Sequence, residues 1–379
     1  MVEVKEFSGL RPLNPEEFCI KPYDIIDDKE AIELRKNENS AIHVILPLGD
    51  EERYKNAKKE FERLKKNMIM DEPSIYVYKE GNNEFSHRGF IICVSLEDYE
   101  KGLIKKHEET REKPLQDRIK HIEATKANTG LVWTIFEKND KLKKKMDEIM
   151  ALPSIFDFEK YGYRHQLWKI NDGKLINQIK EIFSSLELYI ADGHHRMASA
   201  YHYWKKHDGS EAKYVMIFAA SDDEVRILPY NRVIRKIKNK NFLNELNKNF
   251  YVEEMYDLKE PEKHEIQMYY KSRWWKLIPK EIDNGVVDGL DVSILHNKII
   301  EPILGIKDVR KDSNIFFVGG NLSRKKYEII GEKNDAIFYL HPTSVEELEA
   351  VARAGKNMPP KSTWFDPKLL TGLVFHLLE

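Results

Sequence analysis

An acidic residue, a glycine and three potentially cationic residues stand where an apolar run changes into a helical pattern, in "LYIADGHHRMASA", residues 188–200. The apolar run predicts a strand, and Asp192 is expected to cap the following helix by accepting hydrogen bonds from its first N–H groups. Gly193 permits a sharp turn and lets a ligand approach the backbone. We therefore expect a strand-to-helix junction between Asp192 and Gly193.

The side chains that open this helix favour an anionic ligand. The N-terminus of a helix is its positive end, and His194, His195 and Arg196 would oppose the helix dipole unless an anion were bound. Arg196 offers a planar fork of donors suited to phosphate oxygens, and the histidines can donate hydrogen bonds or move protons near neutral pH. The pattern predicts a phosphate cradle at residues 193–196. The alternative is a capped helix whose histidines are ordinary polar residues.

A metal site built by the protein alone is not expected here. Adjacent helical residues point about 100° apart, so His194 and His195 do not easily chelate one ion. His202 follows His195 by seven residues, a rise of about 10.5 Å, which is too far for one ion. The helical zinc motif H-E-x-x-H is missing from the sequence. A magnesium ion carried with a nucleotide needs only one or two carboxylates and stays compatible with the sequence.

Two further polar segments offer candidate site residues. "HEETREKPLQDRIKH", residues 107–121, supplies Glu108 for acid–base chemistry and Arg111 and Arg118 for phosphate binding, unless it forms a solvated charged face. "PPKST", residues 359–363, is not a Walker loop, because two prolines replace the N–H groups that such a loop aims at phosphate. The side chains of its last three residues are still candidates for lining a site: Lys361, Ser362 and Thr363.

Composition narrows the class of protein. The 379 residues carry 62 basic and 64 acidic side chains, a net charge of −2, which gives no general case for binding a polyanion. Cys19 and Cys93 each stand alone in an apolar stretch and are expected to be buried, which suits a reducing cytosol. The sequence begins without an apolar leader, and no run approaches about 18 apolar residues. We expect a cytoplasmic protein without a membrane span.

The hydrophobic patterns predict a mixed α/β architecture of three segments, residues 1–87, 88–235 and 236–379, because strands alternate with helices. A strand is expected from His43 to Leu46, and a helix from Tyr54 to Met68. A hairpin is expected to turn at residues 81–83. The tail from residue 357 is apolar enough that it should dock on the body of the protein.

Seven short motifs follow one another in the order seen in the uncharacterised family called domain of unknown function 1015, and the chain resembles that family over nearly its whole length. They are "FSGLRP", "KPYDII", "HEETREKPLQDRIKH", "ANTG", "LYIADGHHRMASA", "ILPYNRVI" and "MPPKSTWFDPKLLTGL". "YIADGHHR" together with "MPPKST" is specific for the family. One departure is Asn231 in "LPYNR", where the resemblance leads us to expect a histidine.

The middle segment also resembles a more distant group, the ParB/sulfiredoxin-like nucleotide-binding fold, whose members include chromosome-partition CTPases, sulfiredoxin and free-serine kinases. The resemblance implies such a core with N- and C-terminal α/β additions, and ATP or ADP with Mg²⁺ as cofactor. In the kinases a glutamate on an earlier segment activates the serine hydroxyl. The His-Glu in suitable order here is His107-Glu108, although about 80 residues separate Glu108 from Asp192.

Together these observations predict a nucleotide-dependent phosphotransferase whose acceptor is a small hydroxylated metabolite, free L-serine, giving O-phosphoserine. Positioning and charge neutralisation dominate such a reaction. In this hypothesis Asp192 caps the helix and serves as base or Mg²⁺ contact, and Glu108 is the base. The catalytic set also includes His194 and His195. Arg111 and Arg118 clamp charge beside the phosphate cradle, which ends at Arg196.

Two alternatives stay open at this stage. Sulfiredoxin-like chemistry would need a reactive cysteine directly after Gly193, where His194 stands. A nucleotide-binding switch or nucleic-acid-associated regulatory module would need no turnover. The net charge of −2 and the lack of an evident helix-turn-helix pattern argue against nucleic acid as a partner.

Overall fold

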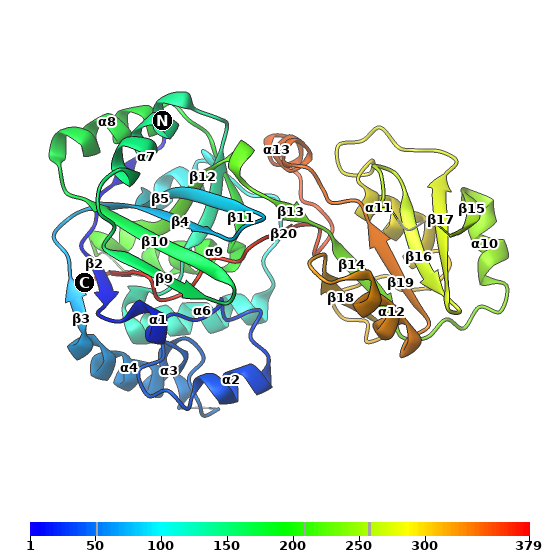
Figure 1. The fold of residues 1–379 in the computed structure, drawn as a ribbon, viewed down its shortest axis with the longest axis horizontal. Helices are drawn as coiled ribbons and strands as arrows, with labels where there is room; N and C mark the ends of the chain where they lie inside the picture. The colour runs from blue at the N-terminus through cyan, green and yellow to red at the C-terminus, as the bar shows by residue number, and fades with distance from the viewer. Residues whose placement is uncertain (51, 208, 257–258) are drawn as a thin grey trace. The chain divides into compact units, whose positions relative to one another are not determined.

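The computed structural model describes residues 1–50, 52–207, 209–256 and 259–379 as a mixed α/β protein of two compact units (Figure 1). The first unit comprises Met1–Lys106, Thr110–Val225 and Pro367–Glu379. The second comprises His107–Glu109 and Arg226–Asp366. The predicted segment 1–87 therefore shares a unit with most of residues 88–235, and its expected end falls inside a strand.

A nine-stranded mixed sheet forms the centre of the first unit, in the order β6-β11-β8-β12-β5-β4-β10-β9, with β1 beside β5. Its middle strands read as nearly continuous apolar runs because both of their faces are buried. The strands are β1 (Val4–Lys5), β4 (Ile75–Gly81), β5 (Ser86–Ser95), β6 (Ile104–Lys105), β8 (Val132–Phe136), β9 (Phe156–Lys160), β10 (Tyr163–Ile170), β11 (Leu188–Asp192) and β12 (Tyr214–Ser221).

Amphipathic helices close the core of this unit. The side chain of Asn139 caps α7 by accepting from two backbone N–H groups, and Leu142, Met146 and Ile149 follow at helical spacing on its buried face. One apolar cluster joins the sheet with α7, α8 and α9. The helices are α1 (Pro15–Phe18), α2 (Asp28–Leu34), α3 (Ile42–Ile45), α4 (Arg53–Leu64), α5 (Leu96–Glu100), α6 (Glu112–Thr125), α7 (Asp140–Met150), α8 (Gly173–Phe183) and α9 (His194–Trp204).

Two sequence-based expectations for the N-terminal part need correction. The strand expected from His43 to Leu46 is wrong, because this segment forms the short helix α3, which contacts α4 and buries three apolar side chains. The helix expected to reach Met68 ends at Leu64, and a 3-10 turn leads into β3 (Met68–Met70). The hairpin of β4 and β5 around residues 81–83 is confirmed.

The end of the chain returns to the first unit. A four-stranded sheet, in the order β3-β2-β21-β7, pairs the last strand with segments from the beginning and the middle of the chain. The expected docking of the tail is confirmed for Pro367–Glu379. The other strands of this sheet are β2 (Gly9–Pro12), β7 (Ala127–Asn128) and β21 (Phe375–Leu377).

The second unit is built on a six-stranded sheet in the order β15-β17-β16-β19-β14-β18, and a short pair, β13 and β20, stands apart from it. Its strands are β13 (Ile227–Leu228), β14 (Tyr230–Ile234), β15 (Phe250–Met255), β16 (Ile266–Tyr270), β17 (Arg273–Pro279), β18 (Ile315–Gly319), β19 (Ala336–Leu340) and β20 (Trp364–Phe365). Its helices are α10 (Phe242–Asn249), α11 (Asp291–Leu295), α12 (Arg324–Glu332) and α13 (Val345–Arg353).

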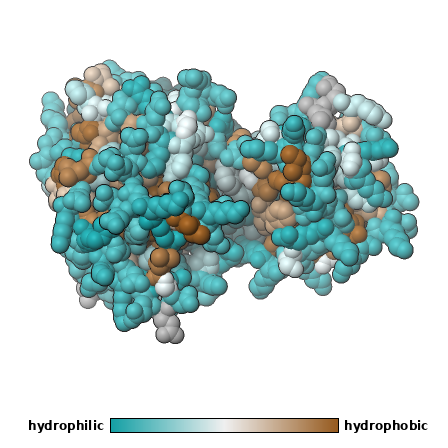
Figure 2. Space-filling model, turned by 60° about the horizontal axis from the view of Figure 1, so that its bottom comes forward, coloured by the Kyte–Doolittle hydropathy of each residue, from teal (hydrophilic) through white to brown (hydrophobic). Residues whose placement is uncertain are grey.

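The surface matches the charged composition. The face seen in Figure 2 is mostly hydrophilic, with apolar side chains in small scattered groups, as expected when 33% of residues are charged. Cys19 and Cys93 are buried free thiols, as predicted. No helix within the described ranges is long and apolar enough to cross a membrane.

Candidate anion-binding site in the first unit

The predicted strand-to-helix junction is present. β11 ends at Asp192, Gly193 adopts a left-handed conformation with φ 92°, and α9 begins at His194. A Cβ atom added at Gly193 would lie 2.8 Å from Arg196 Nε, so the glycine makes room for the guanidinium. The expected capping by Asp192 needs correction, because Gly193 occupies the N-cap position and offers no side chain for it. Asp192 is instead the last residue of the strand.

The carboxylate of Asp192 holds two cations. Its Oδ2 accepts a hydrogen bond from Arg196 Nη2 at 2.5 Å, and its Oδ1 accepts one from Lys368 Nζ at 2.6 Å. All three side chains are largely buried. Arg196 is 14% exposed, Asp192 is 19% exposed and Lys368 is 7% exposed. Asp192 therefore holds two cations near the positive end of α9. Asp192 thus positions both cations at the junction.

Lys368 is a site residue that the sequence did not reveal. It stands 176 positions after Asp192, in a tail recognised only as apolar enough to dock. No local pattern marks this lysine, because its role depends on where the returning tail is packed. In the sequence, Lys368 could have been noticed only as a basic residue within an otherwise apolar tail.

The guanidinium of Arg196 has one donor without an acceptor. Nη1 donates to the carbonyl oxygen of Leu131 and Nη2 donates to Asp192, while the buried Nε has no hydrogen-bond partner among the described residues. Leaving a buried donor unsatisfied costs about 1–3 kcal/mol. An oxyanion bound beside Gly193 would supply the missing acceptor.

A second helix N-terminus meets the first one. Arg111 is the N-cap residue of α6, and its backbone N–H donates to His195 Nε2 at 2.9 Å. His195 therefore accepts this bond through an unprotonated Nε2. The contact brings the positive ends of α6 and α9 together, which strengthens the attraction for an anion. His194, also predicted as a site residue, is buried in the first turn of α9.

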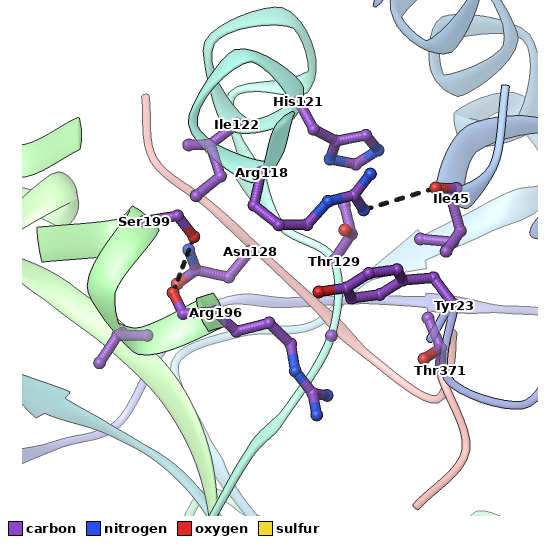
Figure 3. A pocket seen from close by; sticks show the side chains of 12 residues that line it. Tyr23, Ile45, Arg118, His121, Ile122, Asn128, Thr129, Arg196, Ser199 and Thr371 are labelled. Carbon is purple, nitrogen blue, oxygen red and sulfur yellow. Dashed lines mark hydrogen bonds between the residues drawn. The ribbon is translucent and has the colours of Figure 1, made fainter. Parts of the chain in front are cut away.

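A small cavity of about 40 Å³ lies beside this junction (Figure 3). In this view the hydroxyl of Tyr23 lies between Arg118 of α6 and Arg196 of α9. Arg118 stacks over the Tyr23 ring at 4.3 Å and pairs with Asp117 at 2.5 Å. The volume holds a few water molecules or a small polar group, and it is too small for a nucleoside. Its other polar lining residues are His121, Asn128, Thr129, Ser199 and Thr371.

His121 is held neutral in this wall. Burial, with a further contribution from the Arg118 charge, lowers the pKa of His121 to about 3. Its Nε2 lies 2.8 Å from the carbonyl oxygen of Val44, which fits a neutral ring that donates from this nitrogen. At neutral pH the residue is therefore a structural hydrogen-bond donor rather than an acid or base.

The structure brings part of the predicted site together in the first unit. Asp192, Gly193, His195 and Arg196 meet at the junction, Arg111 reaches it through its backbone, and Arg118 lines the cavity with Arg196. Glu108, Lys361, Ser362 and Thr363 belong to the second unit, and their participation in the same site stays a prediction. Within the described part of the chain, no group of three or more His, Cys, Asp or Glu side chains could hold a metal ion.

Comparisons with known proteins place the chain in a family. A family model described as protein of unknown function (DUF1015) matches residues 4–293. Among curated proteins, no sequence matches this chain.

The solved structures that this chain matches include free serine kinase. A mutant of that kinase in complex with AMP has a TM-score of 0.40 and 13% identity, covering 73% of this chain and 87% of its own. A conserved hypothetical protein from Pyrococcus furiosus has a TM-score of 0.38 and 16% identity, covering 75% and 95%. C-terminally truncated SbnI from Staphylococcus aureus has a TM-score of 0.40 and 14% identity, covering 74% and 85%.

Proposed function

We propose that this chain, which belongs to the family described as protein of unknown function (DUF1015), is a nucleotide-dependent phosphotransferase acting on a small hydroxylated metabolite. The observation that carries the proposal is the buried Nε of Arg196, a donor without an acceptor beside the left-handed Gly193. A phosphate oxygen would satisfy this donor.

The electrostatics of the junction favour the same ligand. Two helix N-termini meet there, and two cations, Arg196 and Lys368, are held at Asp192. A nucleotide phosphate carries the opposite charge and several acceptor oxygens, which fit a guanidinium fork and backbone N–H groups. We infer that the strand, glycine and helix form the phosphate-binding part of a ParB/sulfiredoxin-like core. The cofactor we propose is ATP or ADP, with Mg²⁺ carried by its phosphates.

The proposed reaction transfers the terminal phosphoryl group to the hydroxyl of free L-serine. The hydroxyl oxygen bonds to phosphorus, the bond from phosphorus to the nucleotide oxygen breaks, and Glu108 accepts the hydroxyl proton. Arg196, Lys368 and the helix N-termini stabilise the negative charge on the transferred group. The products are O-phosphoserine and the shortened nucleotide. The resemblance noted for the middle of the sequence supports this choice of acceptor.

A nucleotide-binding switch without turnover is the second candidate. The phosphate cradle lies in the first unit, whereas Glu108 belongs to the second. In this alternative the cradle binds the nucleotide without help from the proposed base. A switch would bind the nucleotide through the same Arg196 and leave it intact.

Turnover by a Glu108→Gln variant separates the two candidates. The assay follows phosphate transfer from ATP or ADP to L-serine, with nucleotide affinity measured separately by calorimetry. The kinase hypothesis predicts unchanged nucleotide affinity and a rate lower by about 10²–10⁴, the usual contribution of a general base. Glu109→Gln is the matched control, because Glu109 is a neighbouring carboxylate with no proposed role. Normal turnover by Glu108→Gln would contradict the assigned base, and nucleotide binding without turnover by the unaltered protein would favour the switch.

A further inference from the structure

Arg232, in the middle of β14 of the second unit, is a buried cation that pairs with no carboxylate among the residues that the structure describes. It is 3% exposed. Its Nη1 donates to the carbonyl oxygen of Tyr230, its Nη2 donates to that of Pro360 at 3.4 Å, and its guanidinium lies 5.4 Å from the centre of the Phe317 ring. Burial lowers the pKa of Arg232 to about 9, and the nearby Tyr230 opposes this shift.

Lys361 places a second positive charge against the same tyrosine, Tyr230. Lys361 directly follows Pro360, whose carbonyl Arg232 holds, and its Nζ lies 3.4 Å from Tyr230 Oη and 5.0 Å from the centre of that ring. Neither cation forms an ion pair with a carboxylate of any described residue. Two cations therefore contact Tyr230, and neither forms an ion pair with a described carboxylate.

The loop that carries Lys361 is held in an uncommon backbone conformation. Lys361 has φ 59°, in the left-handed region that non-glycine residues seldom adopt. Ser362 Oγ donates to the carbonyl oxygen of Pro359 at 2.6 Å, and Thr343 Oγ1 donates to that of Ser362 at 3.3 Å. Such local strain persists only where surrounding contacts impose it, and it is concentrated at ligand-binding positions.

The buried charge of Arg232, which pairs with no described carboxylate, needs an explanation. Natural proteins pair a buried charge or place it on a ligand, because an unpaired one is costly. The two carbonyl bonds use two of the five N–H groups of Arg232 and carry no net charge. We propose that Arg232 and Lys361 of the second unit bind a phosphate group.

A phosphate group fits this pair better than a carboxylate does. A phosphate monoester carries about −1.5 to −2 charges at pH 7, which matches two cations, whereas a carboxylate would leave one of them uncompensated. The guanidinium supplies a planar fork for two oxygens and the ammonium supplies a point charge. The phosphate could be free or carried by a nucleotide. All of the residues involved lie in the second unit, so the inference does not rest on the proposed kinase function.

The test measures binding of inorganic phosphate to full-length protein carrying Arg196→Ala, which disables the first cradle. Calorimetry and thermal unfolding are run with phosphate, ADP or ATP, and with acetate at matched ionic strength. We expect phosphate to bind and to raise Tm, and acetate to have little effect. Adding Arg232→Met or Lys361→Met should weaken phosphate binding by about tenfold or more, the effect of losing a charge-assisted bond. Comparing the phosphate and nucleotide arms identifies the carrier of the phosphate group.

The stability of Arg232→Met without phosphate gives a second, independent readout. Replacing an uncompensated buried charge with an apolar side chain should leave Tm unchanged or raise it. A purely structural arginine predicts the opposite, a lower Tm. Arg235→Met is the matched control, because Arg235 is exposed beyond the end of β14 and should leave phosphate binding unchanged.

Three outcomes would overturn the proposal. They are absence of phosphate binding in the Arg196→Ala protein, unchanged phosphate affinity after Arg232→Met, and a lowered Tm with retained phosphate binding. If Arg232→Met does not fold, Lys361→Met decides, because Lys361 is partly exposed. Loss of nucleotide turnover in Arg196→Ala with phosphate binding retained would separate this site from the proposed active site.

Discussion

Arg196 is the side chain on which nucleotide binding is expected to depend most. It combines a charge held by Asp192 with a buried Nε that has no acceptor in the described structure. Arg196→Ala should weaken nucleotide binding by about 1.5–3 kcal/mol, the contribution of a hydrogen bond to a charged group. Calorimetric titration with ADP or ATP and Mg²⁺ measures this loss. Arg164→Ala is the control, because Arg164 is an exposed arginine paired with Asp157. Equal nucleotide affinity in the two variants would contradict the hypothesis that residues 193–196 form a phosphate cradle.

His121 makes the stability of the first unit depend on pH. Burial and the Arg118 charge lower the folded-state pKa to about 3, while the unfolded chain protonates near 6.5. The unfolded state therefore binds more protons as pH falls, so His121 contributes stability above pH 6.5 that is lost progressively down to about pH 3. The slope is about 1.4 kcal/mol per pH unit, or about 2 kcal/mol at pH 5.

His121→Gln should abolish this contribution, because glutamine retains an N–H donor toward Val44 and does not titrate. Urea unfolding at pH 7.5 and pH 5 measures the difference in the free energy of unfolding. The exposed His202, changed to Gln, provides the control and should keep the pH dependence of the unaltered protein. An identical loss of stability on acidification in His121→Gln would show that other groups account for it.

At the scale of elements, the turn between β11 and α9 decides whether Arg196 reaches its position. Gly193→Ala should destabilise the protein in two ways. The alanine would have to adopt a left-handed backbone at φ 92°, and its Cβ atom would lie only 2.8 Å from Arg196 Nε. Gly102→Ala should cause only the backbone strain, since φ is 72° and no atom lies within 4 Å of the added Cβ. We expect both variants to lose stability, by about 1 kcal/mol for the strain at Gly102.

Only Gly193→Ala should also weaken nucleotide binding, because only there does the new methyl group displace the guanidinium. Thermal unfolding and calorimetry on the two variants separate the backbone cost from the effect on the ligand. Unchanged nucleotide affinity in Gly193→Ala would mean that the close approach of Arg196 to the turn is not needed for binding.

At the scale of the whole molecule, the returning tail completes the first unit. Phe375 in β21 is 0% exposed, and its ring centre lies 5.9 Å from that of Phe18 and 5.6 Å from that of Phe61. The same tail delivers Lys368 to Asp192. Docking of the tail therefore links the stability of the unit to the charge of the proposed cradle.

Phe375→Ala should lower the free energy of unfolding by about 3–5 kcal/mol, the usual cost of removing a buried aromatic side chain. Denaturant unfolding monitored by circular dichroism measures the loss. Leu152→Ala, at an exposed apolar position, should have little effect. A small loss in Phe375→Ala, comparable to that in the control, would show that the tail contributes little to the unit.

The sequence by itself determined the features that depend on neighbours along the chain. The apolar strand, the left-handed glycine and the helix that starts with His194 follow one another within a few residues, so backbone sterics and local hydrogen bonds were enough to predict them. The turn at residues 81–83 was predictable for the same reason, and the burial of the two cysteines followed from the apolar residues around them. The expected strand at His43 failed because three apolar residues can bury themselves equally well in one helical turn against α4.

Only the tertiary structure decided which distant groups complete each site. Asp192 was expected to cap a helix, and it instead holds a lysine 176 residues further along the chain. His195 accepts from the backbone of Arg111, and Arg232 and Lys361 meet around one tyrosine, although more than a hundred residues separate these two cations in the sequence. Residue types and their spacing along the sequence do not reveal such pairs. The burial of apolar surface brings these distant residues together, and local propensity plays no part in it.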